Sequence, residues 1–279
     1  MKIFSIGDQV FPGVYRVHSR FRRVVNFVRG EELVAVVARE VGRGPANILS
    51  EGFDPAVDEL EVGEDLLRIG GTEFPLSGVD VYDSRWVPSA IHLQSFPVNL
   101  TVLQLFLREK SPPESLTFLL DPGWEAVGPN SFQGHLKSRA AVLARNLFRS
   151  EADLVAGCRS FKGLGSGLTP AGDDFVAGVL AALGVLERLG GIDRTGLKRE
   201  IAVAVRGTNL IVNSFIALIG GGHFFERLKN LLDGLVGDDP DEVRRTAGEL
   251  IAFGASSGSD LAVGLLLTLK NFRTEVFPD

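Results

Sequence analysis

The chain has 279 residues, 45% of them hydrophobic and 23% charged, which is enough for one large or two ordinary domains with a sizeable core. A net charge of −6 without a long Lys/Arg stripe argues against nucleic acid as a partner, so four arginines within residues 16–23 are interpreted as a solvated strand face or an anion contact. The longest apolar run, residues 175–186, is too short to span a bilayer, and residues 1–8 resemble a strand rather than a signal peptide. One cysteine, Cys158, excludes an internal disulfide and is interpreted as a buried thiol more readily than as a nucleophile. We expect a soluble, cytoplasmic protein that binds neither nucleic acid nor membrane.

Residues 1 to about 90 carry the signals of short β-strands. Two β-branched runs, residues 22–28 and 33–37, are separated by a four-residue turn and predict a hairpin. A second hairpin is predicted where Gly70 and Gly71 join residues 66–69 to residues 72–76, and a further strand is expected at residues 47–49. Short strands at this spacing favour a small antiparallel sheet or barrel.

Beyond about residue 125 the pattern becomes helical. Apolar or amphipathic segments predict helices at residues 136–148, 152–158, 175–186, 197–205, 210–218, 224–235, 241–253 and 260–272, after an earlier one at 100–110. Because strands and helices are segregated, the expected fold class is α+β. We predict a β-rich N-terminal domain over residues 1–125 and a mostly α-helical domain with buried central helices over residues 126–279.

The most informative stretch is residues 163–174, with the sequence GLGSGLTPAGDD. Thr169 is predicted as the N-cap of a helix and Pro170 as its first residue, with Asp173 and Asp174 in the first turn, where the helix dipole favours negative charge. The glycines before the cap allow backbone N–H groups to point into a concavity that holds an anion. The plain alternative is a well-capped helix behind a glycine turn.

A Gly-x-Asp/Asn pattern stands before three apolar runs of the helical half. It occurs as Gly172-Asp173-Asp174, Gly207-Thr208-Asn209 and Gly258-Ser259-Asp260. Helices that are apolar all round are expected to be buried, and their starts need partners for unpaired N–H groups. If the three starts meet, Asp173, Asp174, Asn209 and Asp260 would cap the helices, bind substrate donors or hold a hard cation beside a phosphate. The rival interpretation is three independent caps without a shared pocket.

These observations define the candidate site. The predicted catalytic residues are Asp173, Asp174 and Asp260; the predicted anion-binding residues are Gly163, Gly165, Ser166, Gly167, Thr169, Asn209, Ser256, Ser257 and Gly258. No cofactor is firmly implied, and Mg²⁺ is left open. The four histidines lack zinc-site spacing, the glycine loop lacks the lysine of a P-loop, and residues 220–223 are interpreted as a flexible turn that acts as a hinge or lid.

The run from Gly163 to Gly178 resembles the signature of a bacterial family catalogued as a domain of unknown function, and residues 256–260 resemble that family's second motif. The family includes the AllH subunit of oxamate carbamoyltransferase, which acts in anaerobic allantoin degradation, a route of purine catabolism. The resemblance implies a transferase subunit that works with partner subunits on carbamoyl phosphate and oxamate, both small anions. Whether this chain is itself catalytic is left open.

Two alternatives stay beside this hypothesis. The first alternative is a Mg²⁺-phosphate- or nucleotide-binding enzyme of another reaction, since a glycine loop before a helix suits any phosphate. The second alternative is a non-catalytic assembly subunit whose loops are structural.

Overall fold

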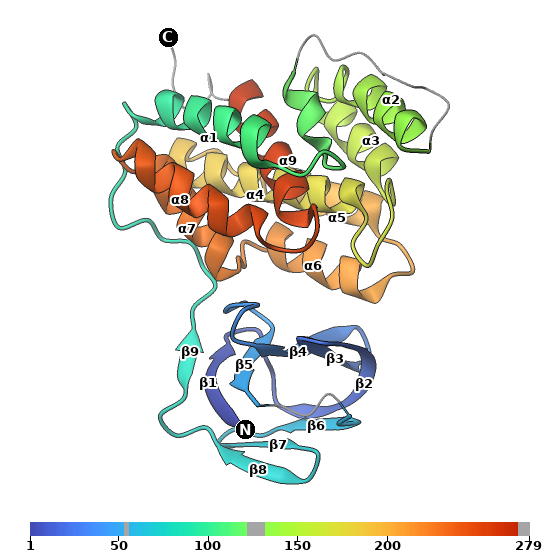
Figure 1. Ribbon diagram of the computed structural model, residues 1–279, viewed down its shortest axis with the longest axis vertical. Coiled ribbons are helices and arrows are strands. Elements are labelled where there is room, and N and C mark those ends of the chain that lie inside the picture. The colour runs from blue at the N-terminus through green and yellow to red at the C-terminus, as the bar shows by residue number, and fades with distance from the viewer. Residues whose placement is uncertain (53–55, 122–131, 273–279) are drawn as a thin grey trace. The chain divides into compact units, whose positions relative to one another are not determined.

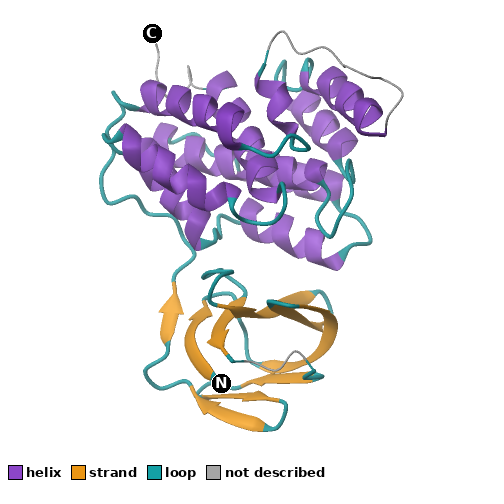
Figure 2. Ribbon diagram, viewed as in Figure 1, coloured by secondary structure: helices purple, strands orange, loops and turns teal. Residues whose placement is uncertain are grey.

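The computed structural model describes residues 1–52, 56–121 and 132–272, and the chain divides into two compact units (Figure 1). The β unit comprises Met1–Trp86 with His223–Lys229, and the helical unit comprises Val87–Gly222 with Asn230–Asp279. Strands occupy the N-terminal part and helices the C-terminal part (Figure 2), which confirms the predicted α+β class. The predicted domain boundary at 125/126 lies outside the described residues.

The β unit is built on one curled sheet, with nine strands among the described residues in the order β8-β7-β6-β2-β3-β4-β5-β1-β9. Both predicted hairpins, β3–β4 and β7–β8, are present, whereas the pairs β4–β5 and β1–β9 are parallel in an otherwise antiparallel sheet. One face buries Tyr15, Phe27, Ile48 and Leu60, which form the core of this unit. The strands are β1 (Lys2–Gly7), β2 (Gly13–Phe21), β3 (Val24–Arg29), β4 (Glu32–Ala38), β5 (Asn47–Glu51), β6 (Glu59–Val62), β7 (Leu66–Ile69), β8 (Thr72–Pro75) and β9 (Asp80–Tyr82).

The segment His223–Lys229 belongs to the β unit although it lies far along the chain. Its Phe224 N–H donates to the Ser84 carbonyl at 2.9 Å, and the Tyr82 hydroxyl donates to the Phe224 carbonyl at 2.8 Å. The turn that we predicted as a hinge or lid leads directly into this segment.

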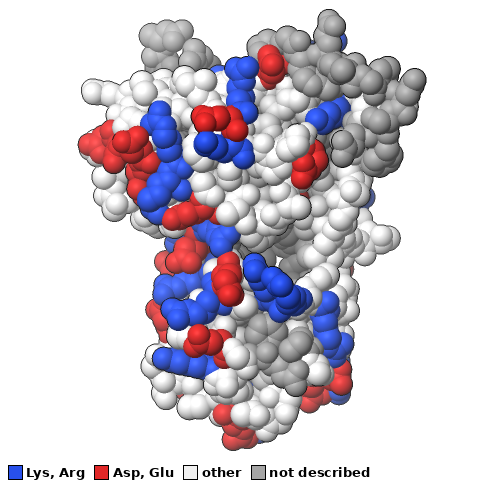
Figure 3. Space-filling view, in the orientation of Figure 1, with Lys and Arg blue, Asp and Glu red and all other residues white. Residues whose placement is uncertain are grey.

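Charges of both signs are interspersed on the molecular face in Figure 3. Within the predicted arginine group, Arg16 forms an ion pair with Glu59 and Arg20 with Asp58. These two arginines therefore lie on a strand face where carboxylates balance their charge.

The described residues contain every helix that the sequence predicted, with ends displaced by a few residues; α7 begins in the segment that belongs to the β unit. The helices are α1 (Phe96–Lys110), the 3₁₀ helix η1 (Leu116–Leu120), α2 (Phe132–Ala144), α3 (Glu151–Phe161), α4 (Ala171–Gly190), α5 (Thr195–Val205), α6 (Leu210–Gly220), α7 (Glu226–Val236), α8 (Pro240–Ile251) and α9 (Ser257–Asn271). In the described part of the chain, no helix combines the length and the apolar character that a membrane crossing requires.

Helices α4 and α9 are the buried centre of this unit, and their backbones touch where they cross. A Cβ placed on Gly178 would lie 2.0 Å from the Leu261 carbonyl oxygen, and one on Gly264 would lie 2.1 Å from the Phe175 carbonyl oxygen. Only glycine permits this approach, since real Cβ atoms do not come so close to another atom. The crossing holds the first turns of the two helices near each other.

Helix α6 corrects one expectation. Its apolar sequence predicted a fully buried helix, but only Val212, Ile216 and Ile219 are buried. The helix packs on α4 and α5, which cover one side of it. The three buried residues are spaced i, i+4 and i+7, so they lie on one face of α6, and the apolar side chains on its other faces stay partly exposed.

Candidate functional site

The start of α4 differs from the predicted cap. Pro170, with φ −58° and ψ 145°, is the N-cap residue, and its carbonyl accepts the N–H groups of Asp173 and Asp174 at 2.9 and 3.1 Å. The prediction that Thr169 caps the helix is therefore wrong. The physical reason is that the Thr169 hydroxyl is engaged elsewhere, on the Asp174 carboxyl.

The glycine loop before α4 is an ordered turn with glycine-dependent geometry. Gly163, Gly165 and Gly167 have φ values of 68°, 112° and 110°, a region that other residues rarely adopt. Leu164 anchors the loop, because its side chain is buried and its carbonyl accepts the Gly172 N–H at 2.8 Å. The tip, which includes Ser166 and Gly167, is exposed.

Asp173 closes the base of this loop. Its Oδ1 accepts the Gly163 N–H at 3.1 Å. Burial raises the pKa of Asp173, while the Gly163 N–H and the charge of Lys162 oppose that rise. The predicted catalytic carboxylate Asp173 is thus occupied with the loop backbone.

Asp174 lies on the other side, where it meets α9. Thr169 Oγ1 donates to Asp174 Oδ2 at 3.2 Å and lies 3.2 Å from Ser257 Oγ. Burial raises the pKa of Asp174 to about 8, and the charges of Asp260 and Asp173 add to the rise, whereas the Ser257 and Thr169 hydroxyls oppose it. We call Thr169, Asp174 and Ser257 the hydroxyl–carboxyl cluster.

Asp260 approaches the cluster from the first turn of α9 and is fully buried. Its Oδ1 accepts the N–H of Leu116, the first residue of η1, at 2.7 Å, while its Oδ2 has no hydrogen-bond partner among the described residues. Burial raises the pKa of Asp260 to about 7, against the Leu116 N–H and the Ser256 hydroxyl. A buried carboxyl oxygen without a donor favours the protonated form.

Asn209 ties the second helix start to the loop. Its Oδ1 accepts the N–H groups of Ile211 and Val212 at 3.1 and 3.3 Å, so it caps α6. Its Nδ2 donates to the Leu168 carbonyl at 2.9 Å, next to Thr169. Asn209 therefore supports the loop from an exposed position.

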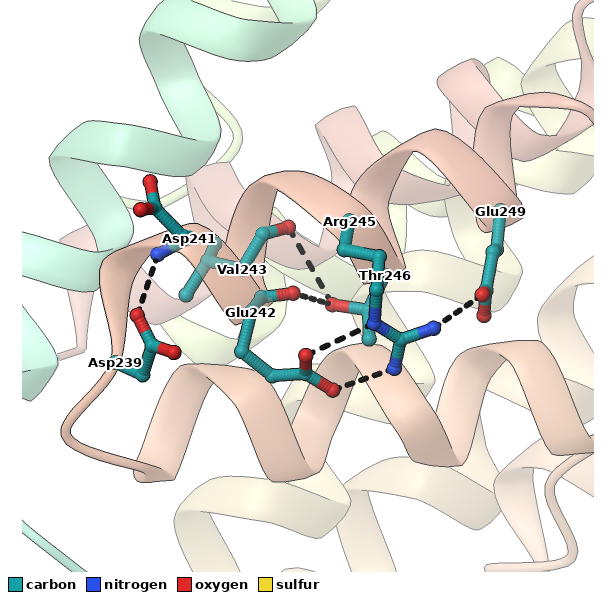
Figure 4. A network of polar contacts seen from close by, with 7 residues as sticks. All are labelled: Asp239, Asp241, Glu242, Val243, Arg245, Thr246 and Glu249. Carbon is teal, nitrogen blue, oxygen red and sulfur yellow. Dashed lines mark hydrogen bonds and ion pairs between the residues drawn. The ribbon is translucent and has the colours of Figure 1, made fainter.

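Helix α8 shows what an ordinary start looks like in the same unit (Figure 4). There Asp239 accepts the Asp241 N–H at 2.9 Å, and Glu242 and Glu249 pair with Arg245 along an exposed face. All four carboxylates drawn there lie at the surface. Asp239 caps the helix, Glu242 and Glu249 pair with Arg245, and Asp241 pairs with Arg244. The starts of α4 and α9 instead bury three carboxyls, none of which caps its own helix with its side chain.

The structure thus brings the first and third predicted helix starts together, and the second reaches them through Asn209. Some predicted anion-binding residues have their groups already engaged: the Gly258 N–H donates to the Phe253 carbonyl at 3.1 Å, and the Gly163 N–H donates to Asp173. Ser256 is half-buried and makes no side-chain cap. The link from Asp260 to Leu116 was missed, and no local signal marks a pair 144 residues apart.

Other chemistry is limited in the described part of the chain. It contains no group of three or more His, Cys, Asp or Glu side chains arranged to hold a metal ion. Cys158 is fully buried, and burial raises its pKa to about 12, so the thiolate that a nucleophile needs is not formed near neutral pH.

Comparison with known proteins agrees with the resemblance of the motifs. Residues 161–269 match the model of the family described as "Oxamate carbamoyltransferase subunit AllH". This match contains the glycine loop, α4, the Asn209 cap and the first turn of α9. No curated protein and no solved structure matches the chain.

Proposed function

We propose that this chain is a subunit of a carbamoyltransferase that acts on carbamoyl phosphate and oxamate, and that the loop before α4 and the first turns of α4 and α9 bind the anionic substrate. The observation that supports it is the meeting of the loop, Asp174 and Ser257 in one polar cluster within the residues that match the AllH family. The family name supports the proposed reaction class, and the cluster supports the proposed location of the site.

The carboxyls of this site are compatible with an anion because burial favours their neutral form. A carboxyl whose pKa is about 8, as for Asp174, carries a proton near neutral pH and donates a hydrogen bond instead of repelling negative charge. The start of α4 adds the positive end of a helix dipole, although the N–H groups of Gly172, Asp173 and Asp174 donate to carbonyls of the chain. Together with the Thr169 and Ser257 hydroxyls, the protonated carboxyl and this dipole suit phosphate and carboxylate oxygens.

Carbamoyl transfer requires two functions of such a site: stabilisation of the departing phosphate and removal of a proton from the attacking nitrogen. The substrate nitrogen attacks the carbamoyl carbon, and the carbon–oxygen bond to phosphate breaks with its electron pair leaving on the phosphate oxygen. Donors that hold the phosphate stabilise the charge that develops there. A proton must also leave the attacking nitrogen, and a carboxyl that titrates near neutral pH is suited to take it.

Isothermal titration of the full chain with carbamoyl phosphate and with oxamate, alone and with candidate partner subunits, tests the proposal. We expect binding that Asp174→Ala weakens at least ~10-fold, because alanine cannot donate the hydrogen bond that the protonated carboxyl donates. Asp241→Ala is the matched control, because Asp241 also lies in a first helical turn but is exposed, so its removal should leave binding unchanged.

Silence in both conditions would overturn the proposal. A thermal-shift screen then separates the alternatives, because ligands that bind the folded state raise its melting temperature. Stabilisation by ATP–Mg²⁺ without carbamoyl phosphate indicates an enzyme of another reaction. Full activity of a reconstituted complex that contains both Asp174→Asn and Asp260→Asn in this chain indicates a non-catalytic subunit.

A further inference from the structure

The Asp174 carboxyl is nearly sealed from solvent but is in contact with hydroxyl groups that are not. Asp174 is 2% exposed. Thr169 and Ser257 are half-buried, and they contact each other as well as the carboxyl. A proton that enters or leaves Asp174 therefore has a short route through these hydroxyls.

Counting hydrogens shows how the cluster responds to protonation. When Asp174 is ionised, Thr169 spends its only hydrogen on the carboxylate, so Ser257 must donate its own hydrogen into the cluster. When Asp174 is protonated, the cluster has three hydrogens for its three contacts, Asp174–Thr169, Thr169–Ser257 and Ser257–Asp174, so each group both donates and accepts. When Asp174 is ionised the cluster has one hydrogen too few, and the missing hydrogen is the proton that it takes up.

A second observation is independent of these contacts. Asp260 is fully buried, and its Oδ2 has no partner among the described residues; the Ser259 hydroxyl beside it in sequence is likewise buried and unpartnered. Unsatisfied buried polar atoms are costly and call for a functional explanation. The charge of Asp260 raises the pKa of Asp174, so the two carboxyls are coupled electrostatically.

We propose that Ser257 and Thr169 form a hydroxyl relay that carries a proton between Asp174 and a substrate bound at Ser257, which makes Asp174 the proton acceptor and donor of the site. The inference rests on the proposed function for the identity of the substrate, a carbamoyl group on nitrogen or phosphate. It assigns separate roles to the three carboxyls that the sequence grouped together.

The relay balances the transfer reaction. As the nitrogen of the acceptor bonds to the carbamoyl carbon and phosphate departs, the nitrogen's proton passes to Ser257 Oγ. The Ser257 hydrogen passes to Thr169 Oγ1, and the Thr169 hydrogen passes to the ionised Asp174. In the reverse direction the protonated Asp174 returns a proton to the departing nitrogen by the same route.

The two other carboxyls act on the relay from outside it. Asp260, on α9, raises the pKa of Asp174 through its charge, as Asp173 does to a smaller extent from α4. Glu114 acts on Asp260 in the same sense, and Lys162 opposes the rise at Asp173. Asp260 is thus a positioning residue that sets the pH at which the relay works, whereas Asp173 holds the loop.

The test follows the Asp174 carboxyl of the full chain by carbon-13 NMR as pH is changed, with Asp174→Asn to assign the signal. No substrate is needed. Thr169→Val removes a hydroxyl that favours the ionised form and should raise the pKa of Asp174 above about 8, whereas Thr169→Ser should restore it. Asp260→Asn removes a repelling charge and should lower it.

The pH profile of carbamoyl transfer by the reconstituted complex gives the second readout. Thr169→Val and Ser257→Ala should each lower kcat/KM about 100-fold, the usual effect of losing positioned proton transfer, and Thr169→Ser should recover most of it. Asp241→Asn should match the wild-type protein. Wild-type pH profiles for Thr169→Val and Ser257→Ala would overturn the relay, as would an Asp174 signal that ignores Thr169→Val. If the NMR shifts appear but no complex transfers carbamoyl groups, the proposed function falls and the proton route stands.

Discussion

Each unit of the molecule contains a carboxyl–hydroxyl network, and the two networks differ in whether every carboxyl oxygen has a hydrogen-bond donor. In the β unit, Asp8 accepts the Ser84 hydroxyl at 2.7 Å on Oδ1 and the Ser84 N–H at 3.1 Å on Oδ2, and His223 Nδ1 lies 2.7 Å from the same hydroxyl. Because Ser84 spends its hydrogen on Asp8, His223 must be the donor in its own contact. Both oxygens of Asp8 are satisfied.

The helical unit leaves its network incomplete. Asp174 and Asp260 are more deeply buried than Asp8, the charge of Asp260 raises the pKa of Asp174, and Asp260 Oδ2 has no donor among the described residues. A satisfied network such as that of Asp8 fixes a segment, here His223–Lys229, to its sheet. A network with an unpaired carboxyl oxygen can still bind a proton or a ligand. The difference predicts opposite responses to mutation and pH.

The largest expected effect comes from the helix crossing that holds the incomplete network. Gly178→Ala places a Cβ 2.0 Å from the Leu261 carbonyl oxygen, which α4 and α9 cannot relieve without moving apart. We expect a loss of at least about 3 kcal/mol in the free energy of unfolding, measured by urea denaturation. Gly196→Ala in α5 is the control, since its Cβ would meet nothing within 4 Å. Equal stability of the two variants would contradict the backbone contact.

The next effect is the pH dependence of stability. The folded pKa of Asp174, about 8, lies above the ordinary Asp value of 3.8, so the folded state holds a proton that the unfolded chain releases. Stability from this group is therefore full at low pH and falls as pH rises from about 4 to about 8, by on the order of 3 kcal/mol or more. Asp174→Asn should be more stable than the wild-type protein at pH above 8.

Asp8→Asn provides the contrast in the satisfied network. Its amide cannot accept both Ser84 donors, so we expect lower stability than wild type at every pH, by about 1–3 kcal/mol. Melting temperatures across the pH range measure both variants. If the melting temperatures of Asp8→Asn and Asp174→Asn changed with pH in the same way, the two networks would not differ as described.

A smaller effect distinguishes the two serines. Ser84→Ala leaves Asp8 and His223 without their shared partner and should cost about 1–3 kcal/mol of stability. Ser257→Ala removes a half-buried hydroxyl whose neighbour Thr169 still serves Asp174, so a loss below about 1 kcal/mol is expected. Chemical denaturation gives both values; a larger loss for Ser257→Ala would make its hydroxyl structural.

The smallest effect belongs to an ordinary cap. Asp239→Ala removes the acceptor for the Asp241 N–H at the start of α8 and should cost about 1 kcal/mol (Figure 4). It should not change carbamoyl phosphate binding. A binding defect in this variant would show that any damaged helix start impairs binding.

Local sequence patterns predicted the elements of this fold because the information is local. Gly70 and Gly71 mark the β7–β8 hairpin, and Asp239 with Pro240 marks the start of α8. The burial of α6 was mispredicted because a count of apolar residues does not reveal how many sides have neighbours. The Gly-x-Asp/Asn pattern identified residues near one another but could not tell their roles apart.

Those roles depend on partners distant in sequence. Thr169 appeared to be a cap because Thr-Pro usually begins a helix, yet its hydroxyl turns to Asp174 in the presence of Ser257, 88 residues away. The Asp260 carboxyl accepts the first N–H of η1 instead of capping its own helix. Burial decides the charge of these carboxyls, and burial here is set by the α4–α9 crossing.

In this account Asp174 carries a proton whenever the site holds phosphate, the state that follows carbamoyl transfer and precedes its reversal. Calorimetric titration of the full chain with inorganic phosphate at pH 8.5, above the Asp174 pKa of about 8, tests this most directly when repeated in two buffers of different ionisation enthalpy. We predict buffer-dependent heats that show proton uptake on binding, absent from Asp174→Asn and retained by Asp241→Asn. Binding with the same heat in both buffers would contradict the account.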